Sequence, residues 1–270
     1  MNPVDRMRLP ESEIPGAWGR LIRWMGRIRP LVWLVGLSVS LAMFVAYLPY
    51  AMRMAFWRNL RAQRTLASMV LVFSLLAISL VWSTGQRIDV WAFLFFNVRG
   101  PRPPWLDWVM LGFTQIGNGI ASLTIAPVLF LAGDRLLAYV LILGTLTLWL
   151  LVELVKALTH RSRPFIKLIQ TRIVGYRAGG RSFPSGHTSQ VFFMATLMAR
   201  HFHVSIWGVF LLYATALLVG LTRMYVGAHY PRDVLAGAIL GTAWGHLGVI
   251  VDGYVLVRIG QNGWDVWSTI

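Results

Sequence analysis

The sequence predicts an all-α protein, a polytopic membrane helix bundle with a six-helix core and one extra N-terminal membrane segment. Hydrophobic residues make up 57% of the 270 residues and charged residues only 13%, whereas soluble domains carry about a quarter charged residues. The hydrophobic residues are grouped in seven runs, and no repeat of fixed period is present. Too few charged residues are therefore present to cover a water-exposed surface, which indicates that most of the chain lies in a membrane.

The seven apolar runs give the expected order of membrane segments. Several have the length of about 20 residues that crosses the hydrocarbon core, although the third and fifth are short. The first begins some 30 residues into the chain, which indicates an extra membrane or re-entrant segment and not a cleaved signal. The runs cover roughly 31–51, 66–84, 118–134, 136–155, 188–202, 204–222 and 233–252.

Three regions follow from this order. Residues 1–65 form a basic N-terminal extension with the extra segment, residues 66–252 form the six-helix core, and residues 253–270 form a C-terminal tail. The segment 52–65 holds four arginines and no acid, so the positive-inside rule places it in the cytoplasm. Segment 85–117, with an interfacial helix around 87–97, is then expected outside.

The same orientation places the loops 156–187 and 223–232 on the outer face. The basic start of the chain disagrees if 31–51 spans the membrane, and a re-entrant segment there removes the conflict.

The charge balance excludes some classes of function. There are 25 basic against 10 acidic residues, and such an excess suits nucleic acid, an anionic membrane or an anionic substrate. The basic residues are scattered between apolar runs, so we expect membrane lipids as partners and no nucleic acid. Cysteine is absent, which excludes disulfides, iron–sulfur clusters and thiol catalysis.

Polar residues gather in three blocks where apolar runs end, all on the predicted outer face. The blocks cover 156–164, 184–187 and 222–233. Lys156 and Arg163 are seven residues apart, about two helical turns, and a helical stretch would direct both the same way. Ser185 and Gly186 open a helix, where free backbone N–H groups favour an anion.

The third block adds a guanidinium and a histidine–carboxylate pair. The planar fork of Arg223 matches phosphoryl oxygens. His229 and Asp233 are four apart at a predicted helix start, where the carboxylate could fix the imidazole tautomer and leave the other nitrogen nucleophilic. His187, from a different segment, would be free to act as a general acid. Individually these basic residues could be only interfacial anchors, but the cluster as a whole favours a functional site.

The three blocks resemble the type-2 phosphatidic acid phosphatase superfamily, which includes lipid phosphate phosphatases and vanadium haloperoxidase-like proteins, here in its bacterial membrane branch. The family pattern is Lys-x6-Arg-Pro, Pro-Ser-Gly-His and Ser-Arg-x5-His-x3-Asp, and Thr222 replaces the serine of the third block. The resemblance covers roughly 66–252. The matching positions are Lys156, Arg163, Pro164, Pro184, Ser185, Gly186, His187, Arg223, His229 and Asp233.

This resemblance implies that the core is catalytic and that the substrate is a lipid phosphate. His229 would attack phosphorus, with Asp233 beside it, and His187 would protonate the leaving oxygen. The phosphoryl oxygens would be held by Lys156, Arg163, Ser185, Gly186 and Arg223. We expect no cofactor and no metal, because no two of the ten acids lie close in sequence on the active face.

The implied enzyme is a hydrolase of a lipid phosphomonoester or diphosphate, such as undecaprenyl diphosphate, phosphatidate, phosphatidylglycerophosphate or a lipid A phosphate. The location expected is a bacterial inner membrane, with the active site on its outer face. A lipid phosphotransferase, a haloperoxidase and a non-catalytic transporter or lipid-binding protein are the alternatives.

Overall fold

The computed structural model describes residues 39, 43, 63–100, 102–177 and 179–262, with side chains up to residue 250. The chain divides into two units, residues 1–56 and 57–270, and the fold described here is that of the second. The predicted segment 31–51 lies outside the described residues, save for Val39 and Met43, and stays a prediction.

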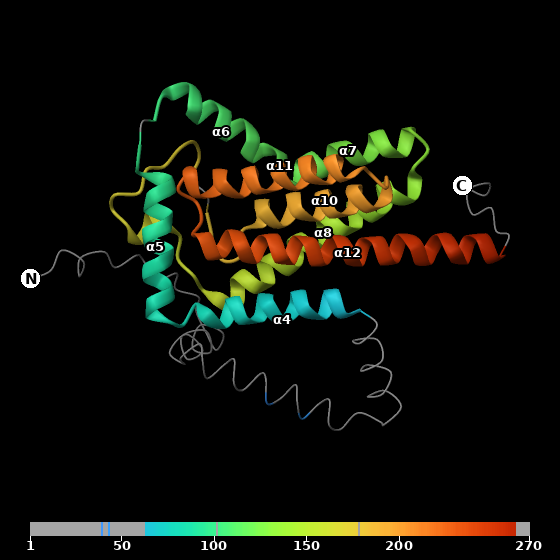
Figure 1. Ribbon diagram of the computed structural model, residues 1–270, viewed down its shortest axis with the longest axis horizontal. Helices are drawn as coiled ribbons and strands as arrows, with labels where there is room; N and C mark the ends of the chain where they lie inside the picture. Colours follow the sequence, from blue (N-terminus) through green and yellow to red (C-terminus); the bar gives the residue numbers. More distant parts are fainter. Residues whose placement is uncertain (1–38, 40–42, 44–62, 101, 178, 263–270) are drawn as a thin grey trace, which may run out of the picture. The chain divides into compact units, whose positions relative to one another are not determined.

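The described part of the second unit is built entirely of helices and loops (Figure 1). This confirms the predicted all-α class. The helices are α4 (Arg64–Ser79), α5 (Ser83–Asn97), α6 (Pro104–Ile116), α7 (Gly119–Leu131), α8 (Arg135–Thr159), α9 (Pro164–Lys167), α10 (Gly186–His201), α11 (Ile206–Tyr225) and α12 (Pro231–Asn262).

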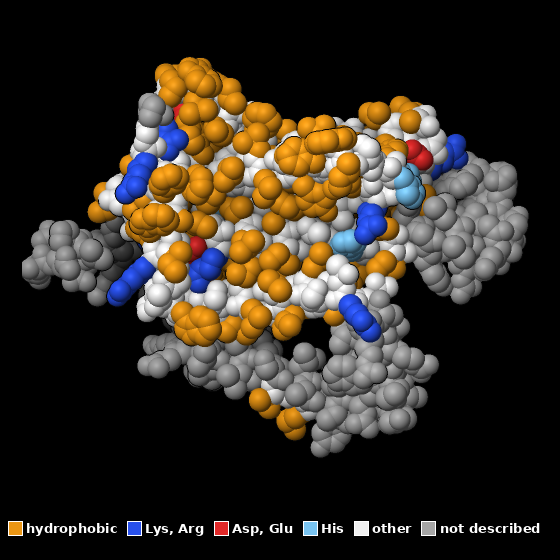
Figure 2. All heavy atoms as spheres, viewed as in Figure 1, with side chains coloured by type: hydrophobic (Ala, Val, Ile, Leu, Met, Phe, Trp, Pro, Cys, Tyr) orange, Lys and Arg blue, Asp and Glu red, His pale blue; other side chains and the backbone are white. Residues whose placement is uncertain are grey.

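Three to five segments among the described residues are long and apolar enough to cross a membrane. Three are single stretches, namely Arg135–Lys167, Ile206–Tyr225 and Pro231–Ile250. Two more are bent pairs, α4 with α5 and α6 with α7, whose axes differ by 96° and 56°. Figure 2 shows apolar side chains over most of the visible face of the bundle, with charged side chains mainly toward its two ends. The protein is thus an integral membrane helix bundle.

The helix expected around 87–97 is present as α5, which turns away from α4 and runs across the ends of the other helices (Figure 1). The prediction for segment 85–117 included only this one helix, whereas the structure has a second one there, α6. Pro103 and Pro104 begin this helix in the manner of an N-terminal proline. The stretch expected to form a single span at 118–134 contains α7, the second helix of the bent pair α6–α7.

Helix α10 lies at the centre of the bundle and packs along α12. Most of its side chains are buried, including Phe193 and Leu197. The close contact depends on glycines of α12, because a Cβ at Gly237 would lie 2.6 Å from the Ser185 carbonyl oxygen. A Cβ at Gly241 would overlap the backbone of Ser189 in the same way. Small residues of this kind let helix backbones approach closely in membranes.

Candidate active site

The three polar blocks meet at one end of the bundle. The segment between α8 and α9, the start of α10 and the α11–α12 junction all contribute. Arg163 Nη1 lies 3.2 Å from His229 Nε2, and the backbone N–H of Ser185 donates to the carbonyl of Asp233 at 2.9 Å. The expectation that bundle packing unites these blocks is therefore confirmed.

His229 is held in one tautomer by its surroundings. Its Nδ1 lies 2.8 Å from the backbone carbonyl of Ser182. A carbonyl can only accept, so Nδ1 carries the proton and Nε2 keeps its lone pair. Arg163 Nη1 donates toward that lone pair at 3.2 Å. The side chain is 2% exposed, so a protein group and not water fixes the ring.

Asp233 acts on this histidine mainly through Ser182. The closest carboxylate oxygen is 3.7 Å from His229 Nδ1, longer than a hydrogen bond. Instead, the carboxylate accepts from the Ser182 hydroxyl and from the Tyr230 N–H at 2.8 Å. The predicted direct hydrogen bond is thus replaced by one to the Ser182 carbonyl, and the charge of Asp233 lies just behind it.

A buried ion network that sequence reasoning missed supports Asp233. Arg161 donates to Asp233 at 2.5 Å and forms a second ion pair with Asp89 of α5. Arg232 Nε also donates to Asp89, at 2.7 Å. Asp89 and Asp233 are 2% and 0% exposed, so the arginines neutralise charges that would be costly to bury alone. The sequence signal for Asp89 was its place on an interfacial helix in a chain with few acids.

The expected phosphate ligands differ in how much hydrogen-bonding capacity they keep. Arg223 is 6% exposed and donates to Thr114 of α6 at 2.6 Å. Its Nε is buried without a partner among the described residues. Arg223 therefore keeps hydrogen-bonding capacity that its protein contacts do not use. Arg163 is already engaged by the carbonyls of Gly179 and Ala228.

The remaining predicted residues lie at helix ends. Ser185 is the N-cap of α10 and accepts from the Thr188 N–H at 3.4 Å, and Gly186 is the first residue of that helix. Lys156 lies in the last turn of α8 and pairs with Glu153 at 2.8 Å. The Thr222 hydroxyl donates to the Val219 carbonyl of its own helix at 2.7 Å.

Burial keeps both histidines neutral. Burial lowers the pKa of His229 to about 3; Arg163 and Arg223 add to this effect, and Asp233 opposes it. Burial and then the charge of Arg223 lower the pKa of His187 to about 2. A bound phosphate would offset the arginine charges, so an anion in this cradle favours protonation of His187.

Comparisons with known proteins agree with this arrangement. The sequence profile of the PAP2 superfamily matches residues 135–255, a range that contains all three blocks. The lipid A 4'-phosphatase of Bacteroides thetaiotaomicron is 31% identical over 59% of this chain and 75% of the relative. The undecaprenyl-diphosphatase of Sulfolobus acidocaldarius is 25% identical over 68% of this chain and 89% of that protein.

A solved structure has the same fold. The transmembrane PAP2-type phosphatidylglycerolphosphate phosphatase of Bacillus subtilis superposes with a TM-score of 0.59. The two chains are 24% identical, and the match covers 70% of this chain and 96% of the other. The sequence matches to the PAP2 profile and to the 31%-identical lipid A 4'-phosphatase show that the chain belongs to the PAP2 superfamily, and the shared fold agrees with them.

Proposed function

We propose that this protein is a membrane lipid phosphatase that works through a phosphohistidine on His229 and needs no metal. The observation that carries the proposal is the locked ring of His229, with Nδ1–H on the Ser182 carbonyl and the Nε2 lone pair beside Arg163. A nucleophile must present its lone pair where the phosphoryl group binds. The guanidinium groups of Arg163 and Arg223 flank that place.

The first step forms one bond and breaks one. His229 Nε2 attacks phosphorus, and the bond from phosphorus to the lipid oxygen breaks. His187 gives its proton to the departing oxygen, which leaves as the lipid alcohol or, from a diphosphate, as the lipid monophosphate. The positive charge that develops on the His229 ring is stabilised by Asp233, whose carboxylate lies 3.7 Å away.

The second step regenerates the enzyme. Neutral His187 takes a proton from water, the oxygen of that water attacks phosphorus, and the nitrogen–phosphorus bond breaks. Inorganic phosphate leaves with His229 neutral and His187 protonated, as at the start of the first step. The buried Nε of Arg223 would donate to a phosphoryl oxygen throughout.

We infer that the substrate is a lipid carrying a phosphomonoester or diphosphate. The candidate cluster lies where apolar helices end, so a headgroup could reach it while the lipid chains stay in the bilayer. Relatives are named for lipid A phosphate and undecaprenyl diphosphate, and the matching structure for phosphatidylglycerolphosphate. The outer face of a bacterial inner membrane remains our proposed location for the site.

The test is phosphate release by the purified full chain in detergent, with chelator in excess. The panel holds undecaprenyl diphosphate, phosphatidate, phosphatidylglycerophosphate and a lipid A phosphate. We expect release that survives chelation and falls by about three orders of magnitude or more in His229→Ala. His203→Asn is the matched control, because this exposed histidine lies beyond the far end of α10.

Three outcomes would overturn the proposal. Equal release by wild type and His229→Ala would remove His229 from the chemistry. Transfer of the phosphate to an added lipid alcohol, without free phosphate, would make the protein a phosphotransferase. No release from any lipid by folded protein would instead favour a non-catalytic, lipid-binding role.

A further inference from the structure

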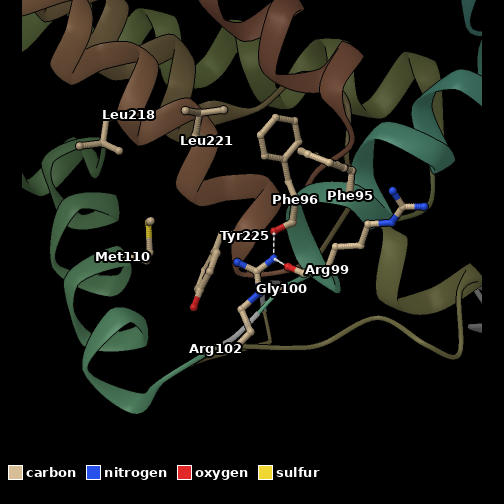
Figure 3. A pocket seen from close by; sticks show the side chains of 9 residues that line it. All are labelled: Phe95, Phe96, Arg99, Gly100, Arg102, Met110, Leu218, Leu221 and Tyr225. Atoms are coloured by element: carbon tan, nitrogen blue, oxygen red, sulfur yellow. Dashed lines mark hydrogen bonds between the residues drawn. The ribbon is translucent and has the colours of Figure 1, made fainter.

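A groove of about 420 Å³ lies between α5, α6 and α11, outside the cluster described above (Figure 3). This volume falls within the range of sites that bind small molecules. The groove is apolar along most of its length and has an arginine at one end. Its main lining residues are Phe96, Arg102, Met110, Leu218, Leu221 and Tyr225.

The groove and the candidate active site lie on different faces of α11. Leu218, Leu221 and Tyr225 are spaced by three and four residues, so they share one face of the helix. Arg223 is two residues from each of the last two, which turns its side chain roughly 200° away from them. It accordingly donates inward, to Thr114. A molecule in the groove would therefore not contact the phosphate cradle.

The groove runs from the membrane interface toward the hydrocarbon core. Tyr225 is the last residue of the span Ile206–Tyr225. Leu218 lies seven residues earlier, which is about 10 Å along a helix axis. A polar end at the interface and an apolar body at membrane depth match a lipid, with its headgroup at Arg102 and one chain along Leu221 and Leu218.

Arg102 supplies the positive charge that would attract an anionic headgroup. One amino group donates to the carbonyl of Phe96 at 2.7 Å, and the guanidinium lies 4.7 Å from the ring centre of Tyr225. Figure 3 shows it at the polar end of the groove, facing that ring. The same amino group also donates to the carbonyl of Arg99 at 2.5 Å, so the guanidinium is held at this end of the groove.

Among the residues that the structure describes, no carboxylate forms an ion pair with Arg102. The nearby carboxylate of Asp107 is already bound by Arg172 and by the Tyr225 hydroxyl at 2.6 Å. Arg99, at the rim of the groove, adds a third cation, and its guanidinium lies 5.9 Å from the ring centre of Phe95. Three arginines against one aspartate favour an anion here.

We propose that this groove binds an anionic membrane phospholipid, with its phosphodiester on Arg102 and one acyl chain along α11. The bound lipid is not a substrate, because it lies on the face of α11 away from His229. Its role is to hold α5 and α6 against α11 next to the active site. The commoner zwitterionic lipids lack the net negative charge that Arg102 and its neighbours attract.

The experiment compares two lipids on the wild type and on two matched pairs of variants. The full chain is delipidated in detergent, and its thermal unfolding is followed after addition of dioleoylphosphatidylglycerol or dioleoylphosphatidylcholine. Native mass spectrometry counts the lipids retained. Arg102→Gln is paired with Arg87→Gln, an exposed arginine of α5 away from the groove. Leu221→Trp, which fills the groove, is paired with Leu217→Trp, which is exposed on the same helix but does not line it.

We expect phosphatidylglycerol to raise the unfolding temperature of the wild type by a few degrees more than phosphatidylcholine does. That difference, and the retained lipid, should persist in Arg87→Gln and Leu217→Trp. Both should be lost in Arg102→Gln and Leu221→Trp. They should also persist in His229→Ala, which shows that the lipid is not bound at the proposed catalytic site even if the proposed activity fails.

Three results would overturn the proposal. The first is an equal response to both lipids, which indicates an apolar groove without headgroup selection. The second is an unchanged phosphatidylglycerol response in Arg102→Gln and Leu221→Trp. The third is a change of oligomeric state in Leu221→Trp alone, which would make the groove a contact between two copies of the chain.

Discussion

His229 Nδ1 and the carbonyl oxygen of Ser182 are 2.8 Å apart, and the hydroxyl of the same serine donates a hydrogen bond to Asp233. Ser182 thus links the carboxylate of Asp233 to the imidazole of His229 through two hydrogen bonds. The hydroxyl contact positions the Ser182 backbone, and the backbone carbonyl fixes the ring. This arrangement makes the proposed chemistry testable beyond loss of activity.

The first prediction concerns the intermediate. With a good leaving group, as in p-nitrophenyl phosphate, attack by His229 needs little help from an acid, whereas attack by water still needs a base. His187→Gln should therefore accumulate an acid-labile phosphoprotein, detected by rapid quenching and mass spectrometry. The double variant His187→Gln/His229→Ala should form no phosphoprotein. A phosphoprotein that persists in it would show that another residue is the nucleophile.

The second prediction concerns pH. The pKa of a free histidine is 6.5, and burial lowers that of His229 to about 3. Between these values the unfolded chain binds a proton at this residue and the folded chain does not, so stability falls as the pH falls through the window. Between about pH 7 and pH 5, the unfolding temperature of His229→Gln should fall less than that of the wild type. An unchanged loss in that variant would contradict the assignment, and His203→Asn serves as the control.

The third prediction concerns the ion network. Arg161→Gln leaves the buried carboxylates of Asp89 and Asp233 without their shared arginine. Removing one partner of a buried ion pair costs about 3–5 kcal/mol, so we expect a clear fall in unfolding temperature and reduced phosphate release. Arg177→Gln, an exposed arginine, should change neither. An unaffected Arg161→Gln would show that the network contributes little.

The fourth prediction concerns Asn97, the last residue of α5, whose side chain bonds the backbone at the C-terminal end of α11. Its amide donates to the carbonyls of Arg172 and Tyr225, both at 2.8 Å, and its oxygen accepts from the Arg172 N–H. Asn97→Asp keeps the acceptor and loses both donors, each worth about 1–3 kcal/mol when a buried partner is left unpaired. Thermal unfolding should show Asn97→Asp well below wild type, and equal stability would contradict these contacts.

The fifth prediction concerns the close packing of α10 and α12. A Cβ at Gly245 would lie 2.5 Å from the Thr196 Cβ, and one at Gly241 would overlap the Ser189 backbone. Gly241→Ala should destabilise the protein by about 1–3 kcal/mol through overpacking. Gly112→Ala, where a Cβ meets nothing within 4 Å, should be neutral or stabilising, since alanine favours helix. Thermal unfolding of the two variants in parallel makes the comparison.

Much of the candidate site could be predicted from the sequence, because it depends on the types of residues present and on their spacing along the chain. The charged ends of apolar runs locate Lys156, Arg163 and Arg223, and a serine before glycine predicts the start of α10. Helix α6 was missed because its proline-rich start and the polar residues Asp107 and Gln115 interrupt the apolar pattern. A span that bends in the middle has no single run of about 20 apolar residues to find.

The contacts that position His229 could not be predicted for a different reason. The group that receives its Nδ1 proton is the backbone carbonyl of Ser182, and a carbonyl is present at every position of a chain. Arg161 is surrounded by other basic residues in the first block, and only the fold shows that it reaches Asp89, 72 positions away. Tertiary packing alone selects such partners.

The central position of α10 has a consequence for how the protein enters the membrane. Thr188, Ser189, Gln190 and Thr196 are all buried in the bundle, and a helix that carries so many polar groups is poorly suited to partition into lipid alone. Its glycine-lined partner α12 follows it in the chain, so α12 is synthesised later. We therefore expect α10 to reach its final packing only after α12 has been synthesised, so that the start of the active site is among the last parts of the protein to be shielded from lipid.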